Sequence, residues 1–283
     1  MFTLPVVSLP YPTRPCALSQ DYIKAIFVRR SFKATLDKML LRVFNLISFA
    51  AFGLCVAKEQ MLPVTICHRD AMDYSTCLRD AIQEAWPRFI PGLPEFNFPP
   101  IDPAFYDHHY ATYDNGELHI SAHSINSTFI GLRDVRFLDV KAYFTDNIFH
   151  LEIVFQTPQV SLEGLAHVVG RVGPFGINST GHYKLVATDN LLRWHILGPV
   201  VNDRWIVERF ILSPRRIKKV ETYLTGFLGS EELDKLFQDF TNEYWPAILR
   251  IVAPVVTKTV EPMFVETTNC LFSNVFFSKV FPK

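Results

Sequence analysis

The spacing of hydrophobic residues along the chain changes at two places, and each change predicts a different kind of element. Ser75 is placed to cap a short helix, which Pro87 and then Pro91-Gly92 should close. The apolar positions of this helix recur at helical spacing and are Leu78, Ala81, Ile82, Ala85 and Trp86. The following residues 92–103 (GLPEFNFPPIDP) predict an extended strap rather than a central strand, because proline fixes φ and removes backbone donors.

From about Leu118 to Leu224, apolar and polar residues alternate with the period of half-buried strands. The alternating apolar positions are Leu118, Ile120, Phe149, Leu151, Ile153, Phe155, Val160, Leu162, Trp205, Val207, Phe210 and Leu212. Turn signals at 114–116 (DNG), 146–147 (DN) and 189–190 (DN) predict antiparallel hairpins. A slip of phase between Phe137 and Leu138 predicts a bulge that bends the strand. Because no helical pattern separates the strands, we expect a meander rather than a βαβ fold.

The helical period returns at Ser230, where a capping residue followed by Glu231 and Glu232 predicts a helix start. Two apolar stripes follow: Leu233, Leu236, Phe237 and Phe240, then Tyr244, Ile248, Ile251, Val255, Thr259 and Met263. Pro246 suits a first turn, whereas Pro254 and Pro262 should kink the helix. About 28 helical residues would extend about 42 Å. The predicted fold class is α+β, with a long C-terminal helix wrapped by a strongly curved antiparallel sheet.

Composition narrows the function classes. Lys plus Arg and Asp plus Glu each total 28, so the formal net charge is zero and the chain lacks the basic footprint of a nucleic-acid-binding protein. The 25 phenylalanines fit either a large core or an interior that also lines a cavity.

The N-terminal region predicts export. Residues 43–53 (VFNLISFAAFG) form a short apolar run between positive residues and Cys55-Val56-Ala57, which is typical of a secretory signal peptide. We therefore expect residues 1–38 to be an upstream extension that is disordered or an artefact of the gene model. Residues 39–57 would be the signal peptide and residues 58–283 a single ligand-binding domain. Arg29, Arg30, Ser31 and Lys33 leave a mitochondrial presequence as the alternative. No other segment resembles a membrane span.

Cysteines and sequons agree with a secreted protein. Cleavage after Ala57 leaves three cysteines, of which Cys67 and Cys77 are expected to form a disulfide. Cys270 is then expected to be a buried free thiol rather than a catalytic one, because no arranged histidine partner is evident. Two sequons in polar, turn-like surroundings predict N-glycosylation at Asn126 and Asn178.

Three ordered motifs resemble the insect takeout and juvenile hormone binding protein family. Residues 67–103 contain two cysteines, an amphipathic helix and a strap ending in PPIDP, similar to the family's N-terminal signature. Residues 233–245 (LDKLFQDFTNEYW) resemble its helix entry, and residues 269–282 (NCLFSNVFFSKVFP) resemble its C-terminal tail. The chain departs from the family at Phe276, where proline is usual, and at Pro174-Phe175 in a strand. A second disulfide, usual in the hormone-binding branch, is not expected here.

The resemblance implies a tubular lipid-binding fold, in which one tunnel between the long helix and the sheet holds a terpenoid such as a juvenile-hormone-like molecule, or a fatty acid. It also implies a role in hormone, circadian or feeding signalling. Predicted tunnel-lining residues are Phe137, Val140, Phe149, Leu151, Ile153, Phe155, Trp194, Val252, Val256 and Val260. Most of these positions would be core even without a cavity, and the sequence does not separate the two uses. Tyr143 and Tyr183 are the predicted polar anchors. The alternative is a secreted interaction protein with a closed tunnel, acting through its surface.

No motif predicts catalysis: the nucleophile elbow, P-loop and dinucleotide fingerprints are absent from the sequence. We predict no enzyme activity, no catalytic residues, no cofactor and no metal. His119 and His123 share a strand face but lack further zinc ligands, and His108-His109 is expected in a surface loop. The basic run 215–219 predicts a solvent-facing strand end rather than a docking patch. The expected partner is a small hydrophobic ligand, with no nucleic acid and no membrane span, and the protein is expected to be a monomer.

The internal signal peptide generates a prediction about processing. Protein secreted from insect cells should begin at or near Lys58, because the small-residue site ends at Ala57. N-terminal sequencing checks this, and secreted protein that retains residues 1–38 would contradict it.

Overall fold

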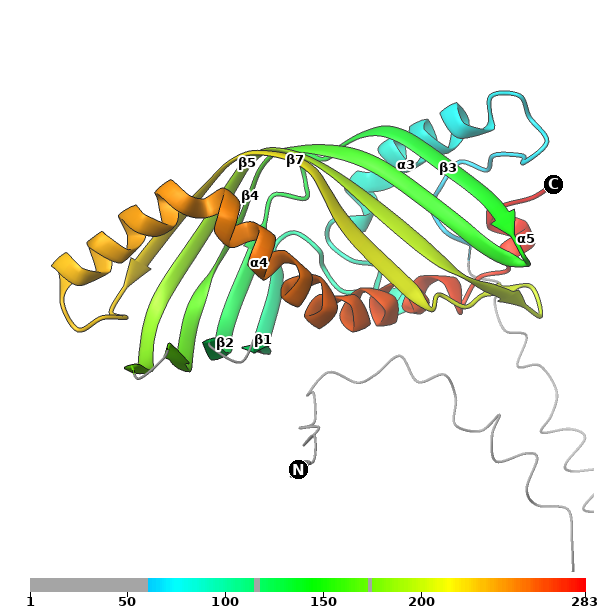
Figure 1. Ribbon diagram of the computed structural model, residues 1–283. Coiled ribbons are helices and arrows are strands. Elements are labelled where there is room, and N and C mark those ends of the chain that lie inside the picture. Colours follow the sequence, from blue (N-terminus) through cyan, green and yellow to red (C-terminus); the bar gives the residue numbers. More distant parts are fainter. Residues whose placement is uncertain (1–60, 115–117, 173–174) are drawn as a thin grey trace, which may run out of the picture. The chain divides into compact units, whose positions relative to one another are not determined.

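A bent antiparallel sheet and one long helix dominate the structure (Figure 1). The computed structural model describes residues 61–114, 118–172 and 175–283, and Met61–Lys283 clusters as one compact unit. The predictions for residues 1–38 and 39–57 therefore lie outside the described residues.

The first helix, α3 (Tyr74–Phe89), forms where the sequence predicts it, with Leu78, Ala81 and Ala85 buried. The predicted cap is wrong: Asp73 occupies the N-cap position, and Ser75 lies inside the first turn. The strap that follows contains no β-strand, only a short 3₁₀ helix, η1 (Pro94–Phe96), and one bridge between Leu93 and Phe98.

The sheet has seven strands in an antiparallel arrangement. They are β1 (Ala104–Asp114), β2 (Leu118–Ile130), β3 (Arg136–Thr145), β4 (Ile148–Val172), β5 (Phe175–Val201), β6 (Arg204–Trp205) and β7 (Arg209–Thr225). The order β1-β2-β4-β5 is extended by β3, which pairs with the first part of β4, and by β7, which pairs with β5. The sheet thus begins at Ala104, earlier than predicted, and His108 and His109 lie in β1 rather than in a loop.

Strands β4, β5 and β7 share one bend, which passes through Pro158, Asp189 and Lys218. The residue-to-residue pairing of the three strands skips these positions and resumes on either side of them. Asp189 has a φ of 49°, so the strand turns sharply there and then continues. The predicted turn at 189–190 is therefore wrong, because both residues lie inside β5. Figure 1 shows these three strands arching over at this level. The bend also changes the phase of alternation, so the inward positions are odd-numbered in β4 up to Thr157 and even-numbered from Val160.

The bend divides the sheet into two halves, which we name by their contents. The packed half contains β3, β6 and the residues of β4, β5 and β7 on their side of the bend: 148–157, 190–199 and 209–217. The open half contains β1, β2 and residues 159–172, 175–188 and 219–225 of the same three strands.

Two other local predictions are confirmed. The register of β3 on β4 shifts between Phe137 and Asp139, so Leu138 is the predicted bulge. The turn at Asp146-Asn147 joins β3 to β4, and both residues have positive φ values of 49° and 64°.

The long helix, α4 (Glu231–Phe272), has 42 residues, more than predicted, and is followed by the short α5 (Phe277–Val280). Ser230 is its N-cap, as predicted, and its side chain accepts a hydrogen bond from the N–H of Leu233. Pro246, Pro254 and Pro262 all lie within the helix. Figure 1 shows that the axis of α4 bends along its length, in agreement with the predicted kinks.

Three polar side chains of α4, spaced four residues apart, attach the helix to the free edge of β7. Asp234 accepts hydrogen bonds from the backbone N–H groups of residues 226–228. Gln238 accepts from Leu224 N–H, while Asn242 accepts from the N–H and donates to the C=O of Thr222. The helix therefore satisfies edge groups that would otherwise be open to another strand.

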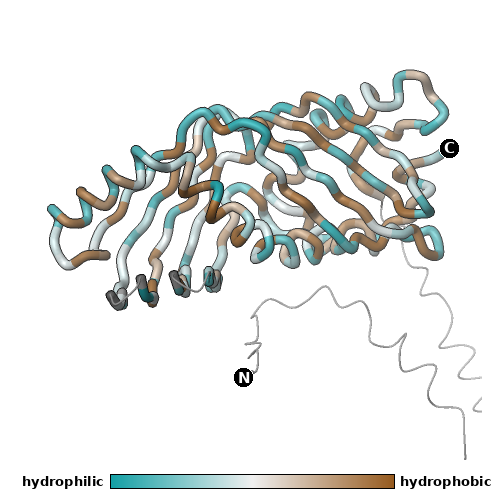
Figure 2. The backbone as a smooth tube through the Cα atoms, in the orientation of Figure 1, coloured by the Kyte–Doolittle hydropathy of each residue, from teal (hydrophilic) through white to brown (hydrophobic). Residues whose placement is uncertain are grey.

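Within the packed half, large side chains fill the space between the sheet, α3, the end of α4 and α5. Trp205, Phe149 and Phe155 have 0% of their surface exposed. The ring of Phe149 contacts the rings of Trp205, Phe277 and Phe281 at centroid distances of 4.8–4.9 Å. Figure 2 shows hydrophobic and hydrophilic positions alternating along these strands.

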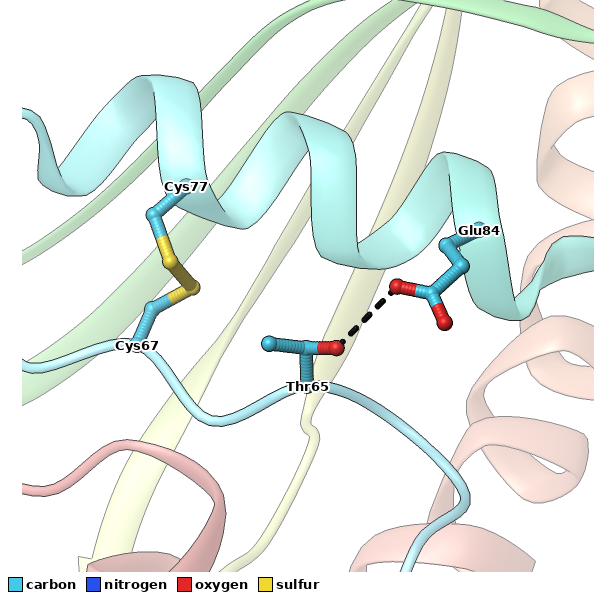
Figure 3. The surroundings of a disulfide bond; sticks show 4 residues. All are labelled: Thr65, Cys67, Cys77 and Glu84. Atoms are coloured by element: carbon cyan, nitrogen blue, oxygen red, sulfur yellow. Dashed lines mark hydrogen bonds between the residues drawn. A yellow bond between two sulfur atoms is a disulfide. The ribbon is translucent and has the colours of Figure 1, made fainter.

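Cys67 and Cys77 form the predicted disulfide, which ties the segment before α3 to the helix (Figure 3). Thr65 donates a hydrogen bond to Glu84 of the same helix at 3.2 Å. Cys270 is disulfide-bonded as well, so the prediction of a free thiol, and of no second disulfide, is wrong.

Removal of the first disulfide should lower stability. In the chain-entropy model, a loop of ten residues is worth about 2.7 kcal/mol, so we expect the Cys67→Ser/Cys77→Ser variant to lose roughly that free energy of unfolding. Guanidinium denaturation of both proteins measures it, and an unchanged midpoint would contradict the expectation.

Asp234 should be important for holding the start of α4. Asp234→Ala leaves three backbone donors without their acceptor, so we expect a loss of about 1–3 kcal/mol and faster amide hydrogen exchange in residues 226–245. Asp239→Ala, which removes an exposed carboxylate from the same helix, is the matched control. Equal exchange rates in the two variants would show that Asp234 does not hold the helix.

Candidate functional site

The predicted tunnel-lining residues of the sheet lie in the packed half. Phe137, Val140, Phe149, Leu151, Ile153 and Phe155 are each at most 5% exposed. A side chain with no exposed surface borders no space that admits a water molecule, so Val140, Phe149 and Phe155 are core residues rather than cavity lining. Trp194 also packs there, with its ring 4.3 Å from that of Phe155.

The inner face of the open half differs from that of the packed half, because it contains several alanines and glycines. Strand register and alternation place Ala111, Ala122, Gly164, Ala166, Gly170 and Gly181 on this face. None of these residues can fill the width between the sheet and α4 as a phenylalanine does. The alanines, Tyr183 and Val168 keep partly accessible surface, whereas Val140, Phe149 and Phe155 of the packed half are 0% exposed. The inner face of the open half is therefore less completely buried than the centre of the packed half.

The helix covers this half from edge to edge. α4 contacts both β7 and β1, which are the two edge strands of the open half. Phe227, just before α4, lies against the inner face of β5. A Cβ on Gly181 would lie 2.6 Å from the Phe227 ring, and Ser179 donates a hydrogen bond to the Phe227 carbonyl.

An apolar stripe on α4 remains exposed along this half. Its members are 42–67% exposed and are Leu233, Leu236, Phe237, Phe240, Tyr244, Ile251, Val252 and Val256. Leu236, Phe240 and Tyr244 lie on a different side of the helix from Asp234, Gln238 and Asn242, because two residues rotate the helix by about 200°. Of the predicted helix positions, Val252 and Val256 therefore belong to the accessible surface, and Val260 is partly exposed. A continuous exposed apolar surface of this kind marks a binding site in most soluble proteins.

A hydroxyl cluster sits on the inner face of the open half. Tyr183 Oη lies 2.7 Å from Ser124 Oγ and 2.9 Å from Ser127 Oγ, and the two serine oxygens are 2.5 Å apart. The tyrosine reaches across β4 because its neighbour there is Gly164, where a Cβ would meet Ser127 Oγ at 2.8 Å. Tyr183 thus lies on the inner face of the open half, and its role as a polar anchor stays a prediction.

Two further polar rings stand next to this cluster on β1. Tyr106 pairs with Ser127 and His109 pairs with Ser124, and their rings contact at 5.2 Å. Burial raises the pKa of Tyr106 and lowers the pKa of His109. Both shifts favour the uncharged form, so these two groups are neutral at neutral pH.

Tyr143, the other predicted anchor, points the opposite way. Its neighbours Val140 and Phe149 mark the inner face, whereas Tyr143 stacks on His150 and donates a hydrogen bond to Glu152 at 2.7 Å. That bond raises the pKa of Tyr143 and lowers the pKa of Glu152. The structure gives no support to Tyr143 as an anchor.

The remaining predicted positions are on the outer surface. Asn126 and Asn178 are exposed but lie in β2 and β5, so their predicted turn-like surroundings are wrong. His119 pairs with Asp114 at 3.1 Å. His123 Nε2 is 3.0 Å from the Nδ1 of His108. Among the described residues, no group of three or more His, Cys, Asp or Glu side chains is arranged to hold a metal ion.

The basic run of β7 is also exposed, but it lies in the middle of the strand rather than at its end. Arg216 pairs with Asp189 at 3.3 Å and Lys219 with Glu221 at 2.8 Å. Nothing in the described part of the chain forms a helix long and apolar enough to cross a membrane.

The sequence did not predict Ser124 and Ser127 as site residues, the small inward residues of the open half, or strand β1. One signal was present: the inward positions of residues 160–187 are mostly small, in contrast to the phenylalanines and tryptophan of the packed half. The hydroxyl cluster had no signal, because its three members are separated by up to 59 residues.

Comparisons with known proteins agree with this architecture. The family model for haemolymph juvenile hormone binding protein matches residues 46–282. The crystal structure of Takeout 1 from Epiphyas postvittana is similar, with a TM-score of 0.55 and 19% sequence identity over 74% of this chain and 93% of that one. A lipopolysaccharide binding protein structure matches at 11% identity over 65% of this chain and 38% of that one, but its TM-score of 0.23 carries no argument.

No curated protein sequence gives a match. At 19% identity the takeout structure shows the fold alone, a curled but unclosed sheet with a long helix. The family model spans most of the chain, so the resemblance seen in its three motifs is confirmed, and the chain belongs to the haemolymph juvenile hormone binding protein family.

Proposed function

We propose that this protein is a secreted carrier that holds one small hydrophobic ligand between α4 and the inner face of the open half. The observation that carries the proposal is the contrast between the two halves of one bent sheet. Phe149, Phe155 and Trp205 are fully buried in the packed half, whereas the inner face of the open half includes alanines and glycines, and α4 carries an exposed apolar stripe. A ligand would cover both apolar surfaces.

The energetics favour an apolar occupant. Burial of apolar surface contributes about 25 cal/mol per Å², so a molecule of terpenoid or fatty-acyl size gains enough to offset the cost of association. The membership of a family described by hormone binding supports the same class of function. No step of this function requires catalysis, a metal or a cofactor.

The second candidate is an interaction protein that binds a partner through its surface. The stripe on α4 would then be covered by a protein rather than by a small molecule. Mass spectrometry of an organic extract of the purified protein separates the two, since a carrier should yield a stoichiometric apolar compound and an interaction protein should not.

Filling the open half should expel a ligand without unfolding the protein. We expect Ala166→Phe to lower the affinity for N-phenyl-1-naphthylamine, a neutral fluorescent apolar probe, by about tenfold or more, while its melting temperature stays close to that of wild type. The added ring occupies space that is already present, so it forces little strain.

The matched control is Val140→Phe, which adds a ring to a side chain with 0% exposure in the packed half. This change should cost about 1–3 kcal/mol and leave probe affinity nearly unchanged at low temperature. If wild type binds no probe, the carrier function is wrong. If Ala166→Phe destabilises the protein as much as Val140→Phe does, the open half is filled and the ligand space lies elsewhere.

A further inference from the structure

Three histidines from three strands lie next to one another on the outer face of the open half. His108 comes from β1, His123 from β2 and His167 from β4. His123 and His167 are direct partners in the strand register, and His108 is diagonal to His123 because it pairs with Ile125. The sequence predicts no metal here, since His119 is the other histidine on the same strand face. The fold, however, brings imidazoles to His123 from both neighbouring strands.

His108 and His123 hold two ring nitrogens at the separation that one metal ion requires. His108 Nδ1 lies 3.0 Å from His123 Nε2, and the ring centroids are 5.1 Å apart. Two metal–nitrogen bonds of about 2.0–2.1 Å place their nitrogens about 2.8–3.0 Å apart at a right angle, and about 3.3–3.4 Å apart at a tetrahedral angle. The observed separation therefore fits two adjacent positions of a square-planar or tetragonal ion, which is the geometry that Cu²⁺ prefers.

The protonation of this pair suits metal binding. Burial lowers the pKa of His123, and so do the neighbouring His108 and His167, which favours the neutral ring that a metal ligand must be. In the 3.0 Å contact one nitrogen carries the proton and the other accepts it. When an ion takes the place of this proton, the donor ring carries its proton on its other nitrogen, so both rings stay neutral.

The surroundings of His123 fix its ring and leave the pair open to solvent. The ring of Tyr110 stacks on that of His123 at 4.1 Å with an interplanar angle of 7°. The outward positions next to His123 on β1, β2 and β4 include no Lys or Arg, so no cation there repels a metal ion. His108 is exposed. His167 Nδ1 contacts Thr180 Oγ1 on β5 at 2.8 Å, away from the pair, so water completes the coordination of the ion.

A second histidine pair on the outer face of the packed half provides a comparison. His150 Nδ1 lies 3.0 Å from His195 Nε2. Arg193 stands beside this pair, and its positive charge opposes the binding of a cation. The nearby carboxylate of Glu152 already accepts a hydrogen bond from Tyr143 and pairs with Arg193 at 3.4 Å. The pair of the open half is therefore the better metal site.

We propose that His108 and His123 bind one divalent transition-metal ion, Cu²⁺ in preference to Zn²⁺, on the outer face of the open half. The site uses two protein ligands, and so differs from the group of three or more that the described residues lack. The ion joins β1, which is the edge strand, to β2. It lies on the opposite side of the sheet from the proposed ligand space, so this inference is independent of the carrier function.

Titration of the untagged protein with copper chloride and with zinc chloride, at neutral pH in a weakly coordinating buffer, tests the site. We expect one tight Cu²⁺ site per chain and a Kd for Zn²⁺ that is about tenfold or more higher, because the right-angled pair and the order of metal affinities both favour Cu²⁺. Electron paramagnetic resonance of the copper complex should show coupling to two imidazole nitrogens. Failure to bind Cu²⁺, tighter binding of Zn²⁺, or several equal copper sites would each overturn the proposal.

Two matched double variants test the residues. His108→Ala/His123→Ala should weaken Cu²⁺ binding about tenfold or more, since it removes both protein ligands. His150→Ala/His195→Ala, which removes the other pair, should keep the wild-type Kd and the two-nitrogen spectrum. Cu²⁺ should raise the melting temperature of wild type and of this control, but not that of the first variant, because an ion that binds the folded state stabilises it. Melting without metal shows that each variant is folded. Wild-type copper affinity in a folded His108→Ala/His123→Ala protein, or an equal loss in both variants, would place the ion elsewhere.

Discussion

The attachment of α4 to the free edge of β7 is the interaction on which the rest of the architecture depends. Gln238 and Asn242 bind backbone groups of β7, and Asp234 binds those of residues 226–228 just after it, so the first turns of the helix are held by polar contacts and not by burial of its apolar side. The exposed stripe is a direct consequence, because the side that carries it is not needed for docking. A helix packed by its apolar face would have closed the space that the open half provides.

The bend at Pro158, Asp189 and Lys218 gives this helix two different surfaces to cover. Without a change of phase at the bend, one half of the sheet would turn its charged face towards α4. The change of phase keeps apolar positions inward on both sides of the bend. The size of the inward residues then decides how tightly each half of the sheet is packed. Phenylalanine and tryptophan produce a solid core, which anchors the end of α4, α5 and α3. Alanine, glycine and serine are smaller, so under the proposed function stability and binding belong to separate halves of one sheet.

Charged and neutral side chains of the open half lie on opposite faces of the sheet. Ion pairs such as Lys184–Glu163 stand on the outward face, where solvent screens them and they contribute little to stability. The inner face of the open half keeps only neutral polar groups, and burial lowers the pKa of His109 and so keeps it uncharged.

The sequence by itself determined the fold class, the helix that contains Cys77, the bulge at Leu138, the cap at Ser230 and the Cys67–Cys77 disulfide, because these features depend on local periodicity or on short spacings. It placed the fully buried Val140, Phe149 and Phe155 in the lining, since alternation identifies inward positions without showing how much space lies above them. Only the tertiary structure decided that Phe149 and Phe155 are core, that 189–190 is a bend, and that Tyr183 meets Ser124 and Ser127. The physical reason is that these outcomes depend on strand register and on the opposing helix, which bring together residues far apart in the chain.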